Sequence, residues 1–126
     1  MIITITNNKG GVGKSTTAQT LAIGLAQKKY KVLVVDLDPQ CSTSITFKAN
    51  DKPNTIYQVL KDNCSITDAI YDNGYINILP SSLELINADD EFKKGVFQYK
   101  MHKLVKEQLD KIKSNYDYII IDTPPK

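Results

Sequence analysis

The 126-residue chain has few of the residues that build disulfide frameworks, metal centres or membrane spans. Its two cysteines, Cys41 and Cys64, are isolated and have no metal-site spacing, which is typical of a protein in a reducing compartment. The single histidine, His102, stands among lysines, where we expect an ordinary surface or boundary role. No stretch reaches the ~18 apolar residues of a membrane-spanning helix. We therefore expect a cytoplasmic protein without a membrane span.

Excess charge is also small. The chain has 16 lysine and arginine residues against 14 acidic residues, which gives a net charge of +2. Such mild basicity does not require a nucleic acid as a partner. Five lysines near the end of the chain are interleaved with Glu107 and Asp110, a pattern more typical of a solvated helix face than of a nucleic-acid surface. These lysines are Lys100, Lys103, Lys106, Lys111 and Lys113.

The chain does have a glycine-rich loop, which reads Asn-Lys-Gly-Gly-Val-Gly-Lys-Ser-Thr over residues 8–16. Its second half fits the phosphate-binding pattern G-x-x-x-x-G-K-[ST], although Asn8 occupies the place of the first glycine. Glycines let backbone N–H groups approach a polyphosphate without a Cβ in the way. The alternative is a plain turn between a strand and a helix. We expect an ATP site with Mg²⁺, formed by Lys9, Gly10, Gly11, Val12, Gly13, Lys14, Ser15 and Thr16.

The segments around this loop have the patterns that such a site needs. Ile2, Ile3 and Ile5 precede it and predict a strand. A helical spacing of apolar residues follows, at Ala18, Leu21, Ala22, Leu25 and Ala26. The spacing predicts a helix that begins near Lys14, with its free N–H groups and positive dipole end directed at phosphate.

Two further segments combine a buried strand with acidic residues. Residues 31–40 contain an apolar run followed by Asp36, Asp38 and Pro39, and residues 116–125 contain three isoleucines followed by Asp122. Unbroken apolar runs are typical of parallel strands covered on both faces. Open α/β sheets bind ligands at the carboxyl ends of such strands. By the strand period of two, we expect Asp36 and Asp38 to share one face. For any one of these acids the alternative is a turn or helix-cap residue.

Together these segments resemble the deviant Walker A ATPases, the superfamily of ParA partition proteins, MinD and the nitrogenase iron protein. The discriminating residue is Lys9, five positions before Lys14, for which the alternative is a solvated surface lysine. Asp-Leu-Asp-Pro-Gln and Asp-Thr-Pro-Pro look most like the ParA/Soj branch. Cys41 and Ser42 depart from the Gly-Asn or Ala-Asn that commonly follows the glutamine, which affects the detail of that loop rather than the nucleotide site.

The resemblance implies roles for the residues that contact phosphate. Lys14 would bind the β- and γ-phosphates, and Thr16 would bind the α-phosphate. Lys9 would reach across a nucleotide sandwich dimer to the partner's phosphates.

It also implies roles around the metal and the attacking water. Ser15 would ligate Mg²⁺, with Asp36 and Asp122 organising the shell of the metal. Asp38 would position the water, so that Lys9, Lys14 and Asp38 form the catalytic set.

The implied function is Mg²⁺-dependent ATP hydrolysis in plasmid or chromosome partitioning. The implied partners are a second copy of the chain on ATP binding and a ParB-like activator protein. Full-length members also bind DNA non-specifically, which we do not expect of this chain because their basic residues usually lie on later helices. The alternatives are a MinD-like positioning ATPase, a metal-cluster or regulatory ATPase, or a nucleotide-binding fragment without turnover.

Strands that alternate with helices predict an α/β fold with a doubly wound, mainly parallel sheet. The resemblance implies that residues 1–126 form the N-terminal part of a ParA-type P-loop domain whose C-terminal part is absent; the alternative is a naturally short form. We therefore expect the last strand to be an unsheltered edge or a badly covered face. The elements expected between the two acidic segments are a helix from Thr55 through Lys61, another from Ser65 through Tyr71, a strand at Ile76 to Leu79, a helix from Ser81 or Ser82 toward Phe92 or Lys93, and a helix that buries Met101, Leu104, Val105, Leu109 and Ile112.

Overall fold

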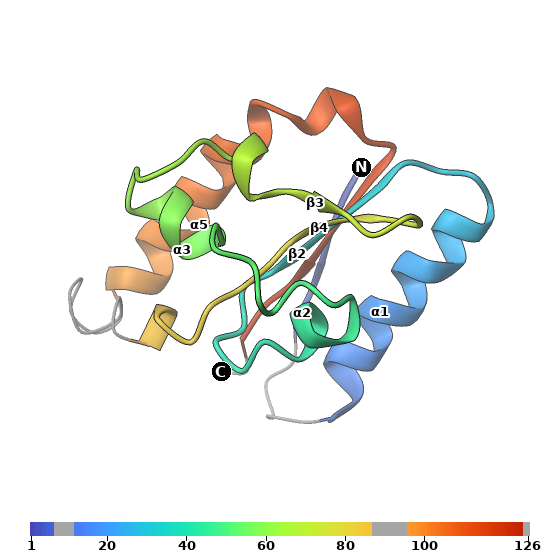
Figure 1. Cartoon of the computed structure of the whole chain (residues 1–126), viewed down its shortest axis with the longest axis horizontal. Coiled ribbons are helices and arrows are strands. Elements are labelled where there is room, and N and C mark those ends of the chain that lie inside the picture. Colours follow the sequence, from blue (N-terminus) through green and yellow to red (C-terminus); the bar gives the residue numbers. More distant parts are fainter. Residues whose placement is uncertain (7–11, 87–95, 125–126) are drawn as a thin grey trace.

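A five-stranded sheet lies at the centre of the computed structural model, with helices on both of its faces (Figure 1). The structure describes residues 1–6, 12–86 and 96–124, and side chains at 1–6, 15–86 and 101–124. The strand order is β1-β5-β2-β4-β3, with β3 antiparallel to β4 and the other described pairs parallel. The predicted α/β, mainly parallel sheet is confirmed. The strands are β1 (Ile2–Ile5), β2 (Val32–Asp36), β3 (Tyr71–Asp72), β4 (Asn77–Leu79) and β5 (Tyr118–Asp122).

The helices flank this sheet, with α1 on one side and α3 and α5 on the other (Figure 1). None of those within the described ranges is long and apolar enough to cross a membrane. Their bounds are α1 (Val12–Gln27), α2 (Ser42–Thr46), α3 (Ile56–Leu60) and α5 (Val96–Asp110), with 3-10 turns η1 (Thr67–Ala69) and η2 (Lys113–Asn115).

The strand β2 shows why its sequence has no polar alternation. All five of its residues are buried. Leu33 and Val35 face the cluster formed with α3 and α5, whereas Val32 and Val34 face the cluster formed with α1. A strand covered on both faces needs apolar residues at every position, and this requirement fixes β2 in the middle of the sheet.

The prediction that the last strand is an unsheltered edge or a badly covered face is wrong. Both faces of β5 are covered, since Ile119 and Ile120 lie in the two opposite core clusters and are at most 1% exposed. β5 is central, because Ile119 pairs with Ile2 of β1 on one side and with Leu33 of β2 on the other. Local sequence does not specify strand order, and a buried apolar run fits the centre of a sheet better than its edge. The edge strands are β1, where Ile2 is 41% exposed, and β3.

Of the three predicted helices between β2 and α5, one is confirmed and two differ from the structure. The confirmed helix is α3, which Thr55 caps, since its hydroxyl accepts a hydrogen bond from the Tyr57 N–H (3.2 Å). The helix predicted from Ser65 through Tyr71 is wrong in length, because only the turn η1 forms and Tyr71 enters β3 to pair with Ile78. The helix predicted from Ser81 or Ser82 starts at residue 85, and its continuation to 92 or 93 lies outside the described residues.

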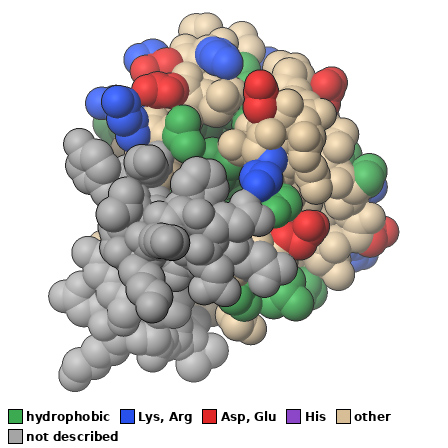
Figure 2. Space-filling view, turned by 90° about the vertical axis from the view of Figure 1, so that its left-hand side faces the viewer, with side chains coloured by type: hydrophobic (Ala, Val, Ile, Leu, Met, Phe, Trp, Pro, Cys, Tyr) green, Lys and Arg blue, Asp and Glu red, His purple; other side chains and the backbone are tan. Residues whose placement is uncertain are grey.

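The described lysine side chains of α5 and of the turn after it lie on a mixed surface, and the Lys100 side chain lies outside the described residues. Lys103, Lys106, Lys111 and Lys113 are exposed, and the Lys113 ammonium is 3.2 Å from the Asp110 carboxylate. Figure 2 shows lysines and acids interspersed over the described part of one face. Opposite charges this close do not concentrate positive potential, so this surface has the pattern of a solvated helix face.

Candidate functional site

Two buried acids lie next to each other where parallel strands end. Asp36 closes β2 and Asp122 closes β5, and the register pairs them directly. Both are fully buried. The first turn of α1 reaches the same strand ends, because the Ser15 hydroxyl donates to Asp122 Oδ2 at 3.0 Å. The structure thus joins the end of the glycine-rich segment to an acid 107 residues away in sequence.

Asp122 is held by hydroxyl groups from two helices. Thr43 of α2 donates to the same oxygen, Oδ2, at 2.7 Å. The Thr43 hydroxyl in turn accepts a hydrogen bond from Gln19 Nε2 of α1 at 3.2 Å. A hydroxyl group has lone pairs that accept hydrogen bonds and a single proton that it donates. Because a Thr43 lone pair accepts from the Gln19 amide, the Thr43 proton is free to point at Asp122.

Asp36 is instead bonded to the loop that follows its own strand. Its Oδ1 accepts from the Asp38 N–H (3.0 Å), and its Oδ2 accepts from the Ser44 N–H (2.9 Å) and the Ser44 hydroxyl (2.6 Å). Burial raises the pKa of Asp36 from its ordinary 3.8 to about 6, although these hydrogen bonds lower it; the charge of Asp122 raises it further.

Asp38 lies beyond the end of β2 rather than on it. The expectation that Asp36 and Asp38 share a strand face is therefore wrong, because β2 ends at Asp36. The Asp38 backbone is fixed by its hydrogen bond to Asp36, and its own Oδ1 accepts from the Gln40 N–H at 3.0 Å. Asp38 is buried, with 7% exposure, in the segment that leads from β2 to α2.

The remaining predicted residues belong to the glycine-rich loop. Lys9, Gly10 and Gly11 lie outside the described residues. Val12, Gly13 and Lys14 form the start of α1, where the structure describes the backbone but no side chains. Thr16 is exposed on the same first turn of the helix. The predicted helix start near Lys14 is confirmed, whereas the phosphate contacts of these residues stay predictions.

Sequence reasoning missed the polar residues that bind the two acids, namely Gln19, Thr43 and Ser44. Thr43 and Ser44 are adjacent and fully buried, and each donates to a different acid. One signal was present: a Ser-Thr-Ser run follows the Asp-Leu-Asp-Pro-Gln segment after a single residue, Cys41. Gln19 lies one turn after Ser15 on α1, so both project from the same helical face.

Cys41 connects this loop to α2 in an unusual backbone conformation. Its φ of 62° lies in the left-handed region, and its thiol donates to the Pro39 carbonyl at 3.3 Å. Burial raises the pKa of the Cys41 thiol, as do the charges of Asp36 and Asp38. A thiol with a raised pKa is a poor nucleophile, so Cys41 fits a structural position.

The oxygen atoms at these strand ends fit a magnesium ion that is held by few protein ligands. Among the residues that the structure describes, no group of three or more His, Cys, Asp or Glu side chains is arranged for a metal. Mg²⁺ needs no such group, because proteins bind it through one or two carboxylates together with waters and substrate phosphates. Ser15 and Asp122 supply a hydroxyl and a carboxylate 3.0 Å apart.

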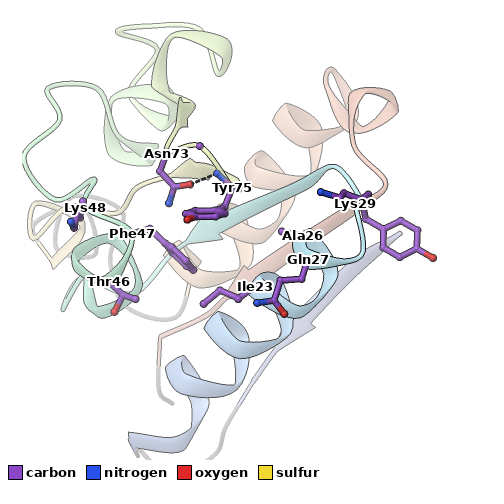
Figure 3. Close-up of a pocket in the computed structure, with 11 residues that line it drawn as sticks. Ile23, Ala26, Gln27, Lys29, Thr46, Phe47, Lys48, Asn73 and Tyr75 are labelled. Carbon is purple, nitrogen blue, oxygen red and sulfur yellow. Dashed lines mark hydrogen bonds between the residues drawn. The ribbon is translucent and has the colours of Figure 1, made fainter.

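A cavity of about 970 Å³ lies elsewhere, between α1, the end of α2 and the turn from β3 to β4 (Figure 3). Ile23, Phe47 and Tyr75 line it, and Lys29 and Lys48 stand on opposite sides of it. The turn is held by the Asn73 side chain, which accepts from the Tyr75 N–H at 3.0 Å. Its described lining contains no acid, so it differs in chemistry from the site at the strand ends.

Comparison with known proteins shows to which family the chain belongs. Residues 1–126 match the family described as AAA domain. The sporulation initiation inhibitor protein Soj of Bacillus subtilis is 37% identical over 98% of this chain and 49% of its own length. The chain thus spans about half the length of this curated relative.

Solved structures with bound nucleotide are also similar. A putative plasmid partition protein of Borrelia burgdorferi bound to AMPPNP has a TM-score of 0.83 and 38% identity, over 99% of this chain and 52% of that one. Cobyrinic acid a,c-diamide synthase of Mycobacterium smegmatis, with a bound ATP analogue and magnesium, has a TM-score of 0.84 and 29% identity, over 99% and 51%. This chain belongs to the AAA-domain family, and its resemblance to the ParA/Soj-type P-loop ATPases is confirmed.

Proposed function

We propose that this chain binds ATP with Mg²⁺ and hydrolyses it in a ParA-type partition system, through a sandwich dimer that forms on ATP. The relatives support the nucleotide and the metal, since similar structures contain an ATP analogue, one of them with magnesium. The supporting geometry is the meeting of the first turn of α1 with the acidic ends of two parallel strands, the usual position of ligands in open α/β sheets.

The observation on which the proposal depends is the 3.0 Å hydrogen bond from Ser15 to Asp122. A serine hydroxyl that donates its proton to a carboxylate still has lone pairs for a cation. The pair therefore matches the hydroxyl and Walker B acid that hold magnesium in P-loop ATPases. A serine placed here only to cap α1 would have no need of a fully buried acid as its acceptor.

The proposed chemistry depends on positioning and charge. Magnesium, when bound, would neutralise negative charge on the β- and γ-phosphates. Ser15 and Asp122 would hold it, and Asp36 would act on it indirectly, because both of its oxygens already accept hydrogen bonds from the loop. Asp38, on that same loop, would orient the attacking water.

The lysines of the glycine-rich loop would bind the phosphates. Lys14 would bind the β- and γ-phosphates within one subunit and Thr16 the α-phosphate. Lys9 would contact the phosphates of the partner subunit, as an arginine finger does in trans. Hydrolysis would therefore depend on dimer formation.

The test compares Lys14→Ala with Lys9→Ala. We expect Lys14→Ala to abolish binding of a fluorescent ATP analogue. Lys9→Ala should spare binding but lower dimerisation, measured by light scattering, and reduce turnover by on the order of 10³-fold if the lysine acts like an arginine finger. Lys28→Ala, at an exposed position after α1, is the control and should match the unaltered chain. Equal turnover by Lys9→Ala would contradict the trans mechanism.

In the cell, the proposed partner is a ParB-like activator, with the protein in the cytoplasm; non-specific DNA binding is proposed for the full-length protein and not for this chain. Because the chain spans about half of Soj, a specific alternative is nucleotide binding without turnover. A single-turnover assay with excess chain over ATP separates the two, since the alternative predicts binding but no phosphate release.

A further inference from the structure

We propose that Thr43 is a positioning residue of the metal site, holding the Asp122 carboxylate in the orientation in which it serves magnesium. This inference rests on the proposed function and adds to it a residue of α2 that the Walker motifs do not contain. Thr43 would act through Asp122, without contact to the nucleotide.

The first argument is geometric. The Thr43 hydroxyl donates to Asp122 Oδ2 at 2.7 Å, shorter than the 3.0 Å bond from Ser15 to the same atom. Hydrogen bonds from a hydroxyl to a carboxylate at this distance belong to the stronger charge-assisted class. Thr43 therefore restrains the orientation of Asp122 at least as strongly as the expected metal ligand Ser15 does.

The second argument is that the Thr43 hydroxyl is itself oriented. Gln19 Nε2 donates to it at 3.2 Å, so the threonine proton is directed at the carboxylate. The relay runs from α1 through α2 to the end of β5, and Thr43 is fully buried at its centre. Metal ligands in proteins are commonly oriented by such outer partners.

The third argument is the position of Thr43 in the chain. It lies in the first turn of α2, and the next residue, Ser44, is bonded to Asp36. Neighbouring residues of one short helix thus hold the two acids that close adjacent strands. Through this arrangement the loop that contains Asp38 is tied to the same carboxylate that would bind magnesium.

The experiment measures the Mg²⁺ concentration at the midpoint of nucleotide binding, using a fluorescent ATP analogue and no turnover readout. Thr43→Val keeps the shape of the side chain and removes the hydroxyl. We expect its midpoint to rise 10- to 100-fold, the usual effect of losing an outer partner of a metal ligand. Binding of the analogue in excess chelator should stay within about 2-fold of the unaltered chain, because Thr43 would act through the metal ligand Asp122 and not on a phosphate.

Rescue and control variants separate positioning from packing. Thr43→Ser restores the hydroxyl without the methyl group and should return the midpoint to within about 3-fold of the unaltered chain. Thr46→Val makes the same chemical change at an exposed position of α2 and should leave the midpoint unchanged. Gln19→Leu should raise the midpoint less than Thr43→Val, and should add nothing to it in the double variant, because the two residues act in one relay.

The outcomes are distinct. An unchanged midpoint in Thr43→Val, or a Thr43→Ser midpoint as high as that of Thr43→Val, overturns the inference and leaves the proposed function standing. Nucleotide binding by the unaltered chain that does not depend on Mg²⁺ overturns the proposed function and this inference with it. Should Thr43→Val not fold, the Gln19→Leu midpoint decides, and an unchanged value there overturns the relay.

Discussion

Asp36 and Asp122 are alike in position and differ in what holds them. Both are fully buried acids that close adjacent parallel strands in register. Asp36 accepts two backbone N–H groups and one hydroxyl, all from the eight residues that follow it. The bonds to Asp122 Oδ2 come from hydroxyls 79 and 107 residues away in sequence.

This difference separates a loop-holding acid from a site-facing acid. Backbone N–H groups fix a carboxylate to one local conformation, so Asp36 sets where the chain goes after β2. Hydroxyl groups have lone pairs as well as protons, so the environment of Asp122 can also accept a cation. Two acids that are equally buried, at the carboxyl ends of neighbouring strands, therefore have different expected roles.

Removing the Ser44 hydroxyl should have the largest effect on stability. Ser44 Oγ donates to Asp36 at 2.6 Å and accepts from the Ser81 N–H at 2.9 Å, both in a buried setting. Ser44→Ala leaves that N–H without its acceptor and weakens the support of a buried carboxylate. We expect it to lower the free energy of unfolding by about 3–4 kcal/mol, measured by urea denaturation.

Ser42→Ala is the matched control, because Ser42 is exposed at the start of the same helix. Its effect should stay within about 0.5 kcal/mol. A loss below about 1 kcal/mol in Ser44→Ala would contradict the loop-holding role of Asp36. We expect Ser44→Ala to change mainly the free energy of unfolding and Thr43→Val to change mainly the Mg²⁺ midpoint. This result would sharpen the contrast between the two acids.

The raised pKa of Asp36 predicts a pH dependence of nearly the same size. Because its pKa is 3.8 ordinarily and about 6 in the fold, the folded chain binds the extra proton between these values. Stability from this group is therefore full below pH 4 and is lost as the pH rises through 6. The loss amounts to about 3 kcal/mol.

The measurement is urea denaturation at several pH values between 4 and 7, in chelator and without nucleotide. Asp36→Asn has no proton to release, so its stability should vary less over this range than that of the unaltered chain. Parallel curves for the two proteins would show that Asp36 titrates as an ordinary carboxyl group.

The sequence predicts the strands that end in acids, because an apolar run followed by Asp is a local pattern. It also predicts the start of α1 after the glycines. The central place of β5 is not local information, since strand order depends on which strands pair across the whole chain. Tyr71 shows the same limit. The local sequence predicts that it ends a helix capped by Ser65, but in the structure it lies in a strand because it pairs with Ile78.

The relay of Gln19, Thr43 and Asp122 could not be predicted for a related reason. The α2 helix has only five residues, too few for an apolar periodicity to show which side chains turn inward. A threonine after a loop is ordinarily read as a solvent-facing or capping residue. Its role appears only once the fold places it 2.7 Å from an acid on another strand.

The smallest predicted effect concerns the end of α2, the helix that supplies donors to both acids. Lys48 has a φ of 59°, its N–H bonds the Ile45 carbonyl (3.0 Å), and the Ala49 N–H bonds the Ser44 carbonyl (2.8 Å). This pattern ends a helix in the left-handed conformation that glycine adopts without cost. Lys48→Gly should therefore raise the free energy of unfolding by about 0.5–1 kcal/mol. Lys48→Ala keeps the Cβ and should give no gain, so equal effects of the two variants would show that the lysine side chain, rather than backbone strain, governs how α2 ends.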